Sequence, residues 1–137
     1  MTRIEKLNPL DIKRYLDVLD LSGQDKAAMD FCHLMSVGTW AGLIDDKLAA
    51  LWGLMPPTVL SNQAYLWLYT TEAMSGHEFI LVRHSQIVVK EMLKEYPNIV
   101  GHAVINNHKA IRWLKWLGAK FEQPTGGGLP FRITKNG

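Results

Sequence analysis

Two residues beside apolar, strand-like runs carry side chains suited to proton transfer. His102 lies within the run NIVGHAVI at residues 98–105, and Glu72 directly follows the run AYLWLYTT at residues 64–71. Histidine titrates near neutral pH and a carboxylate can also accept a proton, so both residues are candidate general bases. The alternative for His102 is a hydrogen-bonded strand residue, which is the commoner role of a single histidine in such a run.

The sequence offers no spacing typical of a metal site. Motifs such as H-E-x-x-H are absent around the remaining histidines, which are His33, His77, His84 and His108, and we expect no bound metal. Cys32 is the single cysteine, so no internal disulfide can form, which suits a reducing compartment. Its apolar segment, AAMDFCHLM, indicates a small buried residue rather than a nucleophile.

Length and composition indicate one globular domain over residues 1–137. Hydrophobic residues make up 47% of the chain and charged residues 20%, which is enough apolar material for a proper core. The net charge of +2 is too small to indicate nucleic acid by itself. We find neither a signal-peptide pattern nor an apolar run of about 18 residues, and we therefore expect a cytoplasmic protein without a membrane span.

Hydrophobic periodicity and turn residues predict the elements that position these side chains. The predicted strands cover residues 3–7, 39–44, 47–55, 64–71, 98–105, 119–123 and 129–134. The predicted helices cover residues 8–20, 24–36, 77–96 and 107–117, and Asp45 with Asp46 forms the turn of a hairpin. The order β, α, α, β, β, β, α, β, α, β, β indicates a mixed α/β sheet.

Two of these helices have apolar residues that we expect to face the sheet. In the helix at 24–36 they are Ala28, Phe31, Cys32 and Met35. In the helix at 77–96 they are Phe79, Val82, Val89, Leu93 and Tyr96, with Ile80 and Ile87 widening the stripe. Residues at these spacings lie along one side of an α-helix.

The stretch VINNHKAIRWLKWLGAKFE carries a spaced motif of helix chemistry. Asn107 can cap a helix by accepting hydrogen bonds from free backbone N–H groups. Ala110 and Leu114 fall on the side expected to pack against the sheet. Gly118 permits the left-handed turn that ends the helix.

The element order and this motif resemble the GNAT acetyltransferases over essentially the whole chain. Many GNAT proteins have an asparagine after the fifth strand, an alanine three residues on, an aromatic residue four later and a glycine four after that; Asn107, Ala110, Leu114 and Gly118 occupy these places. Gly53 also stands where the family often has glycine. The resemblance implies a single α/β GNAT-like domain with a mixed, mostly antiparallel sheet of about seven strands flanked by four helices. Two neighbouring strands, the one parallel pair, are expected to splay apart.

The resemblance also implies acetyl-CoA as cofactor and a CoA thioester as partner. The pantetheine would bond backbone groups of the fourth strand, and the pyrophosphate would bind a glycine-rich loop at a helix N-terminus. The residues this implies are Leu68, Tyr69, Thr70, Thr71, Ser75, Gly76 and His77, with Asn107 nearby.

The loop TTEAMSGHEF departs from the family pattern, which has a glutamine or arginine, two residues, a glycine, any residue, and then glycine or alanine. Only Gly76 remains of its glycines, and Glu72 and Glu78 place negative charge where phosphates would sit. An alternative interpretation, which the spacing favours, is that Ser75 caps the following helix and Glu78 completes a capping box.

The family's usual acid is also replaced. Leu114 stands where many members have a tyrosine that protonates the leaving thiolate, and leucine cannot transfer a proton. Tyr69 is a nearby substitute without further support in the sequence.

A closer resemblance is to GNAT-like proteins of tailed phages that are described as internal virion or assembly proteins. It rests on EYPNIV, NNHKAIRWLKWLGAKF and GLPFRITKNG. It implies a protein of the host cytoplasm or the virion. Two functions follow: an N-acyltransferase with degenerate motifs, or a non-catalytic protein that acts through contacts with phage or host proteins.

A third hypothesis concerns the basic helix at 107–117. Its cations, together with Lys120, are His108, Lys109, Arg112 and Lys115, with Trp113 and Trp116 among them. Nucleic-acid bases could stack on the tryptophans, but the mild net charge favours a solvated basic face and makes nucleic acid an unlikely partner. A protein interface, including self-association, is the remaining alternative because tryptophan and arginine are favoured there.

Overall fold

The computed structural model describes residues 1–8, 11–19, 23–56, 63–126 and 128–135. Its strands are β1 Thr2–Lys6, β2 Gly38–Ile44, β3 Lys47–Met55, β4 Gln63–Thr70, β5 Asn98–Ala103, β6 Lys120–Phe121 and β7 Leu129–Thr134. Its helices are α1 Asp11–Val18, α2 Gly23–Met35, α3 Glu78–Glu95 and α4 His108–Trp116, with a short 3₁₀ turn, η1 Glu72–Met74. The predicted order is confirmed, and η1 is an addition to it. The end of GLPFRITKNG, at residues 136–137, and residues 9–10 of the first predicted helix lie outside the described residues.

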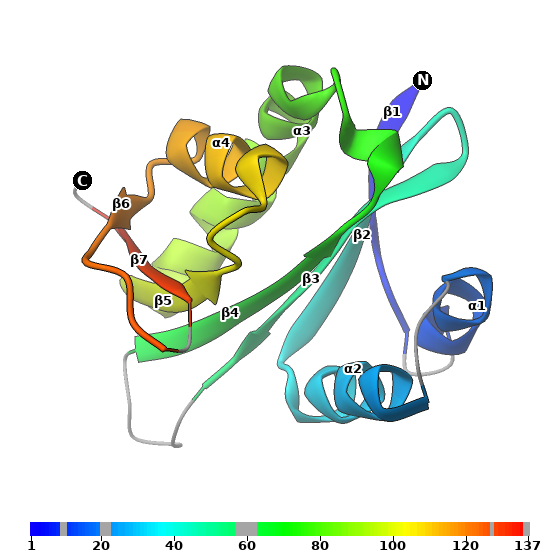
Figure 1. Cartoon of the computed structure of the whole chain (residues 1–137), viewed down its shortest axis with the longest axis horizontal. Helices are drawn as coiled ribbons and strands as arrows, with labels where there is room; N and C mark the ends of the chain where they lie inside the picture. The colour runs from blue at the N-terminus through cyan, green and yellow to red at the C-terminus, as the bar shows by residue number, and fades with distance from the viewer. Residues whose placement is uncertain (9–10, 20–22, 57–62, 127, 136–137) are drawn as a thin grey trace.

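The seven strands form one sheet in the order β1-β2-β3-β4-β5-β7-β6. Every neighbouring pair is antiparallel except β4 and β5, which are parallel. Helices α3 and α4 lie on one face of the sheet, and α1 and α2 lie on the other (Figure 1). The predicted fold class, a mostly antiparallel seven-stranded sheet with four helices in a single domain, is confirmed.

Two hydrophobic cores result, one on each face of the sheet. The larger core joins the sheet to α3 and α4, and the smaller joins it to α1 and α2. Strand β4 serves both, because successive side chains of a strand point to opposite faces. Leu66 and Leu68 enter the larger core, whereas Tyr65, Trp67 and Tyr69 enter the smaller one.

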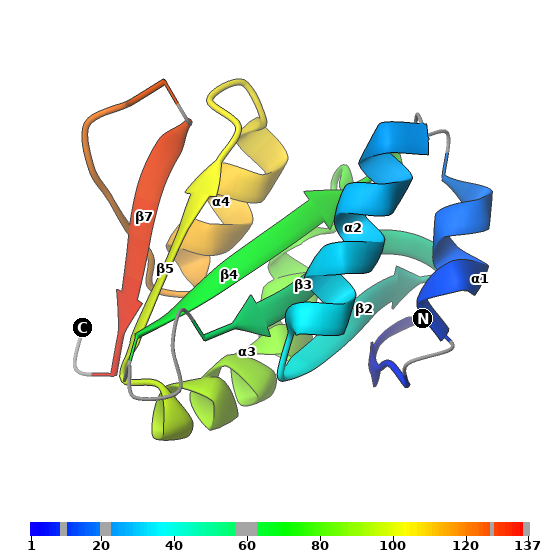
Figure 2. The same cartoon turned by 90° about the horizontal axis from the view of Figure 1, so that it is seen from below.

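The smaller core covers only part of its face. Seen from that side, α2 crosses β2 to β4, while none of the described helices lies over β5 and β7 (Figure 2). His102 of β5 and Arg132 of β7 are exposed on this uncovered part of the sheet. The face is therefore accessible beside the parallel β4–β5 pair.

Gly53 has a steric reason to be glycine. It pairs directly opposite Trp67, and a Cβ atom there would lie 2.4 Å from Nε1 of the Trp67 indole. The indole thus lies across β3 and donates a hydrogen bond to Oγ of Ser36 at 2.8 Å, just after α2. This contact fixes α2 against the sheet.

The expected sheet-facing sides of α2 and α3 are partly wrong. On α2, Phe31 and Met35 are 60% and 56% exposed, whereas Cys32 packs against the smaller core as predicted, together with Met29. On α3, three of the residues predicted to face the sheet, Phe79, Ile80 and Ile87, are exposed. Leu81, Ser85 and Met92 are buried instead. The reason lies in α4: Nε1 of Trp113 donates to Oγ of Ser85 at 3.2 Å, so α4 selects which side of α3 turns inward.

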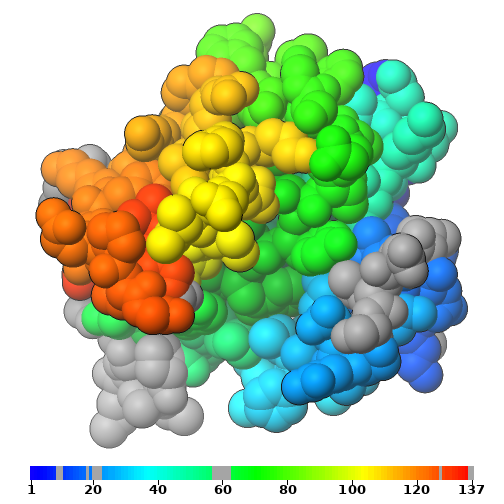
Figure 3. All heavy atoms as spheres, in the orientation of Figure 1, coloured from blue at the N-terminus to red at the C-terminus, as the bar shows by residue number. Residues whose placement is uncertain are grey.

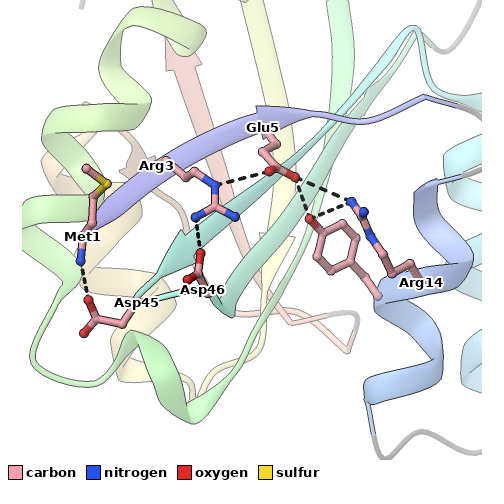
Figure 4. Close-up of polar contacts among 7 residues, drawn as sticks. Met1, Arg3, Glu5, Arg14, Asp45 and Asp46 are labelled. Carbon is pink, nitrogen blue, oxygen red and sulfur yellow. Dashed lines mark hydrogen bonds and ion pairs between the residues drawn. The ribbon is translucent and has the colours of Figure 1, made fainter.

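The predicted β2–β3 turn is confirmed and lies in a network of ion pairs (Figure 4). Asp45 and Asp46 both have positive φ, of 51° and 66°. Such angles are those of the two-residue turns that suit a hairpin's twist. Arg3 of β1 pairs with Asp46, and the amino group of Met1 pairs with Asp45. These pairs hold the turn against β1.

Among the described residues, no helix is both long and apolar enough to cross a membrane.

Candidate functional site

Strands β4 and β5 pair over three positions and then separate. Gln63, Ala64 and Tyr65 pair with Asn98, Ile99 and Val100. At the last point of close approach, a Cβ atom on Gly101 would lie 2.6 Å from the Leu66 carbonyl oxygen. Beyond it the strands diverge towards their C-terminal ends (Figure 2). The predicted splay of one parallel pair is present.

The backbone of β4 offers hydrogen-bonding groups to this opening. The Leu66 carbonyl is directed at β5, and in a strand the backbone groups of alternate residues point to the same edge. Leu68 and Thr70 therefore face the opening. Tyr69 faces β3, as does Thr71, whose N–H donates to Ala49 O at 2.9 Å. Of residues 68–71, which were predicted to bind a cofactor, Leu68 and Thr70 have backbone groups directed at the opening.

Asn107 lies on the α4 side of the mouth of the opening, by which we mean the end of the opening at the C-terminal end of β4. Its Oδ1 accepts from the Ala110 N–H at 3.2 Å, which confirms the predicted cap. Its Nδ2 donates to Oγ1 of Thr70 at 2.9 Å. One side chain thus ties the end of β4 to the start of α4, and these segments are in contact in the space-filling view (Figure 3).

The loop between β4 and α3 leaves the start of α3 without a side-chain cap. The helix begins after His77, which makes no capping hydrogen bond, and Ser75 instead ends η1. The capping-box interpretation of Ser75 and Glu78 is therefore wrong. Because the first three N–H groups of a helix have no intrahelical partner, this end of α3 presents donors and a positive dipole end beside Gly76.

Helix α4 supplies a cation to each carboxylate of this loop. Lys109 Nζ lies 2.9 Å from Oε1 of Glu72, and Nη1 of Arg112 lies 3.3 Å from Oε1 of Glu78. The Glu78 side chain is 6% exposed, whereas that of Glu72 is 91% exposed. The negative charge that the sequence places at the loop is thus offset by two cations from α4.

The two candidate bases differ in their surroundings. Glu72 lies at the loop and engages Lys109. His102 is exposed on the opposite, α2-bearing face, beyond the last β4–β5 pair, and its Nδ1 lies 3.4 Å from the Tyr65 hydroxyl. The structure therefore places them on different sides of the sheet, with His102 beside the opening.

The α4 side chains at the acid and stacking positions are buried. Leu114 is completely buried between α4 and the sheet. Trp113 is also buried, with its ring edge-on to Trp52 at 5.2 Å between centroids. Only Trp116 is exposed, and it packs against Phe79. Trp113 is therefore not available to stack on a nucleic-acid base.

Other features lie apart from the opening. A cavity of about 440 Å³ lies between the C-terminal half of α3 and β2, with Trp40 and Tyr96 among its walls. Within the part of the chain that the structure describes, no three histidine, cysteine or acidic residues lie close enough together to hold a metal ion. Cys32 is partly exposed, and burial raises the pKa of its thiol.

Sequence reasoning missed three side chains at this site: Tyr65, Lys109 in its pairing with Glu72, and Arg112 in its pairing with Glu78. The charge pattern does not indicate these two ion pairs by itself, because they depend on α4 lying next to the β4–α3 loop. The place of Tyr65 depends on the β4–β5 register, which aligns it with Val100 and hence diagonally with His102. No local pattern contains that register.

Comparison with solved structures defines the fold. The GNAT domain of PAT from S. lividans is 16% identical, with a TM-score of 0.67, over 97% of this chain and 90% of that one. The PaiA N-acetyltransferase of Thermoplasma acidophilum, solved with coenzyme A, is 16% identical with a TM-score of 0.68 over 98% and 99%. An acetyltransferase of Bacillus subtilis, also solved with CoA, is 12% identical with a TM-score of 0.67 over 98% and 99%.

The chain therefore has the fold of the GNAT N-acetyltransferases. No family model matches it, and no curated protein matches it in sequence. At these sequence identities the similarity establishes the fold alone. The activity has to be inferred from the residues of the site.

Proposed function

We propose that this protein is an acyl-CoA-dependent N-acyltransferase. The observation that carries the proposal is the splay between β4 and β5, where Leu68 and Thr70 direct backbone groups into the opening. The uncapped start of α3 lies just beyond the end of β4, separated from it by one short loop. Two of the structurally similar acetyltransferases were solved with CoA.

The two ends of the opening suit different parts of acetyl-CoA. The backbone N–H and C=O groups of Leu68 and Thr70 suit the amides of a pantetheine arm. The N–H groups of Gly76 and of the first turn of α3 suit a pyrophosphate. The N–H groups of Ser75 and His77 already donate to the carbonyl oxygens of Glu72 and Met74. Asn107 acts here by holding the mouth in place, because its amide already bonds Thr70 and Ala110.

His102 is the candidate base for the acceptor amine, and Glu72 is the second candidate. His102 is exposed beside the opening, so its Nε2 can receive the proton as the amine attacks the thioester carbonyl. Glu72 would first have to release Lys109. Since buried Leu114 supplies no acid, the departing thiolate takes its proton from water.

Amide chemical shifts test where the cofactor binds. Acetyl-CoA should shift the amide signals of Leu68, Thr70, Gly76 and Phe79 and leave those of β1 unchanged. Shifts confined to other regions, for example to the cavity beside Trp40, would contradict the proposed site. A titration of the same labelled protein with adenosine diphosphate should shift only the loop signals, because adenosine diphosphate lacks the pantetheine arm.

A non-catalytic role is the second candidate, with a phage virion or host protein as partner. The observation that favours it is the absence of the usual acid, because Leu114 is part of the core and not a displaced surface residue. The assignment to the phage proteins rests on the three sequence motifs alone. If millimolar acetyl-CoA caused no amide shift, the result would favour this non-catalytic role over the enzyme.

A further inference from the structure

Tyr65 and His102 form a pair at the place where β4 and β5 begin to separate. Tyr65 is the last residue of β4 that pairs with β5, opposite Val100. His102 lies two residues beyond Val100, so its side chain is on the same face and diagonal to Tyr65. The Tyr65 hydroxyl is 3.4 Å from Nδ1 of His102, and the ring centroids are 6.0 Å apart.

The direction of this hydrogen bond decides which imidazole nitrogen is basic. A neutral imidazole has one N–H donor and one acceptor nitrogen. A distance of 3.4 Å is long for a hydrogen bond in either direction, and the direction follows from the tautomer of His102. Catalytic hydrogen bonds are also often long before substrate is bound. For Nε2 to accept a proton from an amine, Nδ1–H must be the donor in this contact and the phenol oxygen the acceptor.

The surroundings of Tyr65 keep its oxygen available as an acceptor. Burial is the main cause that raises the pKa of the Tyr65 phenol, so it stays neutral at physiological pH. Other polar groups on this face include Tyr69 of β4, Cys32 of α2 and Arg132 of β7, which lies opposite Val100.

We propose that Tyr65 is a positioning residue for His102. By accepting from Nδ1–H, it leaves the lone pair of Nε2 directed away from β4 and available to the acceptor amine. The inference rests on the proposed function, in which His102 is the base.

In the proposed reaction, the amine nitrogen bonds to the thioester carbonyl carbon, and its proton passes to Nε2 of His102. The carbon–sulfur bond breaks and the electron pair leaves with the CoA thiolate, which water protonates. Tyr65 exchanges no proton and only stabilises the imidazolium through Nδ1–H.

The imidazole tautomer in the free protein is the first test. Nitrogen-15 spectra of the His102 side chain at a pH where it is neutral should show mainly the Nδ1–H form in the wild type. Tyr65→Phe should shift the population towards the Nε2–H form that free histidine prefers, and Tyr69→Phe, the matched control on the same strand, should not. A predominant Nε2–H form in the wild type, or the same populations in Tyr65→Phe, would overturn the proposal.

Kinetics separates this inference from the proposed function. With acetyl-CoA and a primary amine acceptor, Tyr65→Phe should lower kcat about tenfold with an unchanged KM for acetyl-CoA. His102→Gln should lower kcat further, and Tyr65→Phe added to it should have no additional effect. A wild type that acetylates amines while Tyr65→Phe keeps full kcat overturns the positioning role alone. A wild type that binds no CoA overturns both proposals, and the tautomer spectra are then a purely structural result.

Discussion

Glu78 is a buried carboxylate whose single recorded partner within the described residues is Arg112, on another helix. Its position at the first turn of α3 suits a negative charge, because the positive end of the helix dipole lies there. The pairing with Arg112 joins α3 to α4 beside the loop that we assign to the pyrophosphate. A charge that opposes phosphate in the sequence is thus part of the support of the site in the structure.

Arg112→Met should lower the free energy of unfolding. Removing the cation leaves Glu78 buried without its partner, which is costly, although half exposure of Arg112 reduces the effect to about 1–2 kcal/mol. Urea unfolding at pH 7 would measure it, with Lys90→Met on the exposed side of α3 as the control. Equal stability of the two variants would show that the ion pair does not support the loop.

At the scale of elements, Asn107 has two structural tasks that one substitution removes together. It caps α4 and ties that helix to Thr70 at the end of β4. The cap is local, whereas the contact with Thr70 joins segments that are far apart in the chain, at the mouth of the opening. The integrity of the mouth therefore depends on this side chain.

Asn107→Ala should destabilise the protein by about 1–2 kcal/mol, since the cap is lost. It should also weaken binding of acetyl-CoA, because the mouth is no longer held. Thermal unfolding and calorimetric titration measure the two effects, and Asn106→Ala, the exposed neighbouring asparagine, is the control. A stability loss without any change in binding would separate the cap from the site.

The sequence predicts the elements of this protein better than their facing sides. Strand and helix order follows from periodicity, and Asn107, Gly118 and the Asp45–Asp46 turn follow from local backbone chemistry. The inward side of α3 does not, because apolar residues surround the helix and Ser85 is buried by its bond to Trp113. Long-range partners decide such cases.

The same limit applies to the candidate site. Leu68 and Thr70 are predicted from the resemblance, but the alternation that separates them from Tyr69 and Thr71 requires the pairing of β4 with β3. Ser75 illustrates the opposite error, since a local capping pattern is present and α3 starts three residues later. Local patterns thus indicate where the site lies, and the sheet decides which atoms face it.

At the scale of the whole molecule, β1 and α1 are joined by a hydrogen-bonded carboxylate. The Tyr15 hydroxyl donates to Oε1 of Glu5 at 2.7 Å, and Arg14 lies 3.8 Å from the same oxygen (Figure 4). This hydrogen bond is the main cause that lowers the pKa of Glu5. The first strand and the first helix are thereby held to the sheet in a pH-dependent way.

Tyr15→Phe should reduce the sensitivity of folding to acid. A carboxyl group whose pKa is lowered on folding contributes stability above its ordinary pKa of about 4.3, and this contribution is lost as the pH falls through the folded value. For the partly exposed Glu5 we expect about 0.5–1 kcal/mol.

Urea unfolding at pH 7 and pH 3.5 measures this difference in acid sensitivity. The wild type should lose more stability than Tyr15→Phe over that interval, and the control Tyr96→Phe should behave like the wild type. Equal losses in the wild type and Tyr15→Phe would contradict the assignment of the pH dependence to this bond.

The most direct test of the central claim, that the β4–β5 opening and the adjoining loop bind acyl-CoA, is a calorimetric titration with acetyl-CoA. The wild type should bind with a Kd between about 1 µM and 1 mM, the range typical of enzymes and their substrates. Gly76 has a φ of +80° and open space around it, so Gly76→Asp puts a carboxylate beside the proposed phosphates and should weaken binding at least about tenfold. Gly118→Asp, the same change at another glycine with a positive φ (+101°) and open space around it, carries the same kind of backbone strain away from the loop and should bind as the wild type does. An absence of heat from the wild type at millimolar acetyl-CoA would contradict the account.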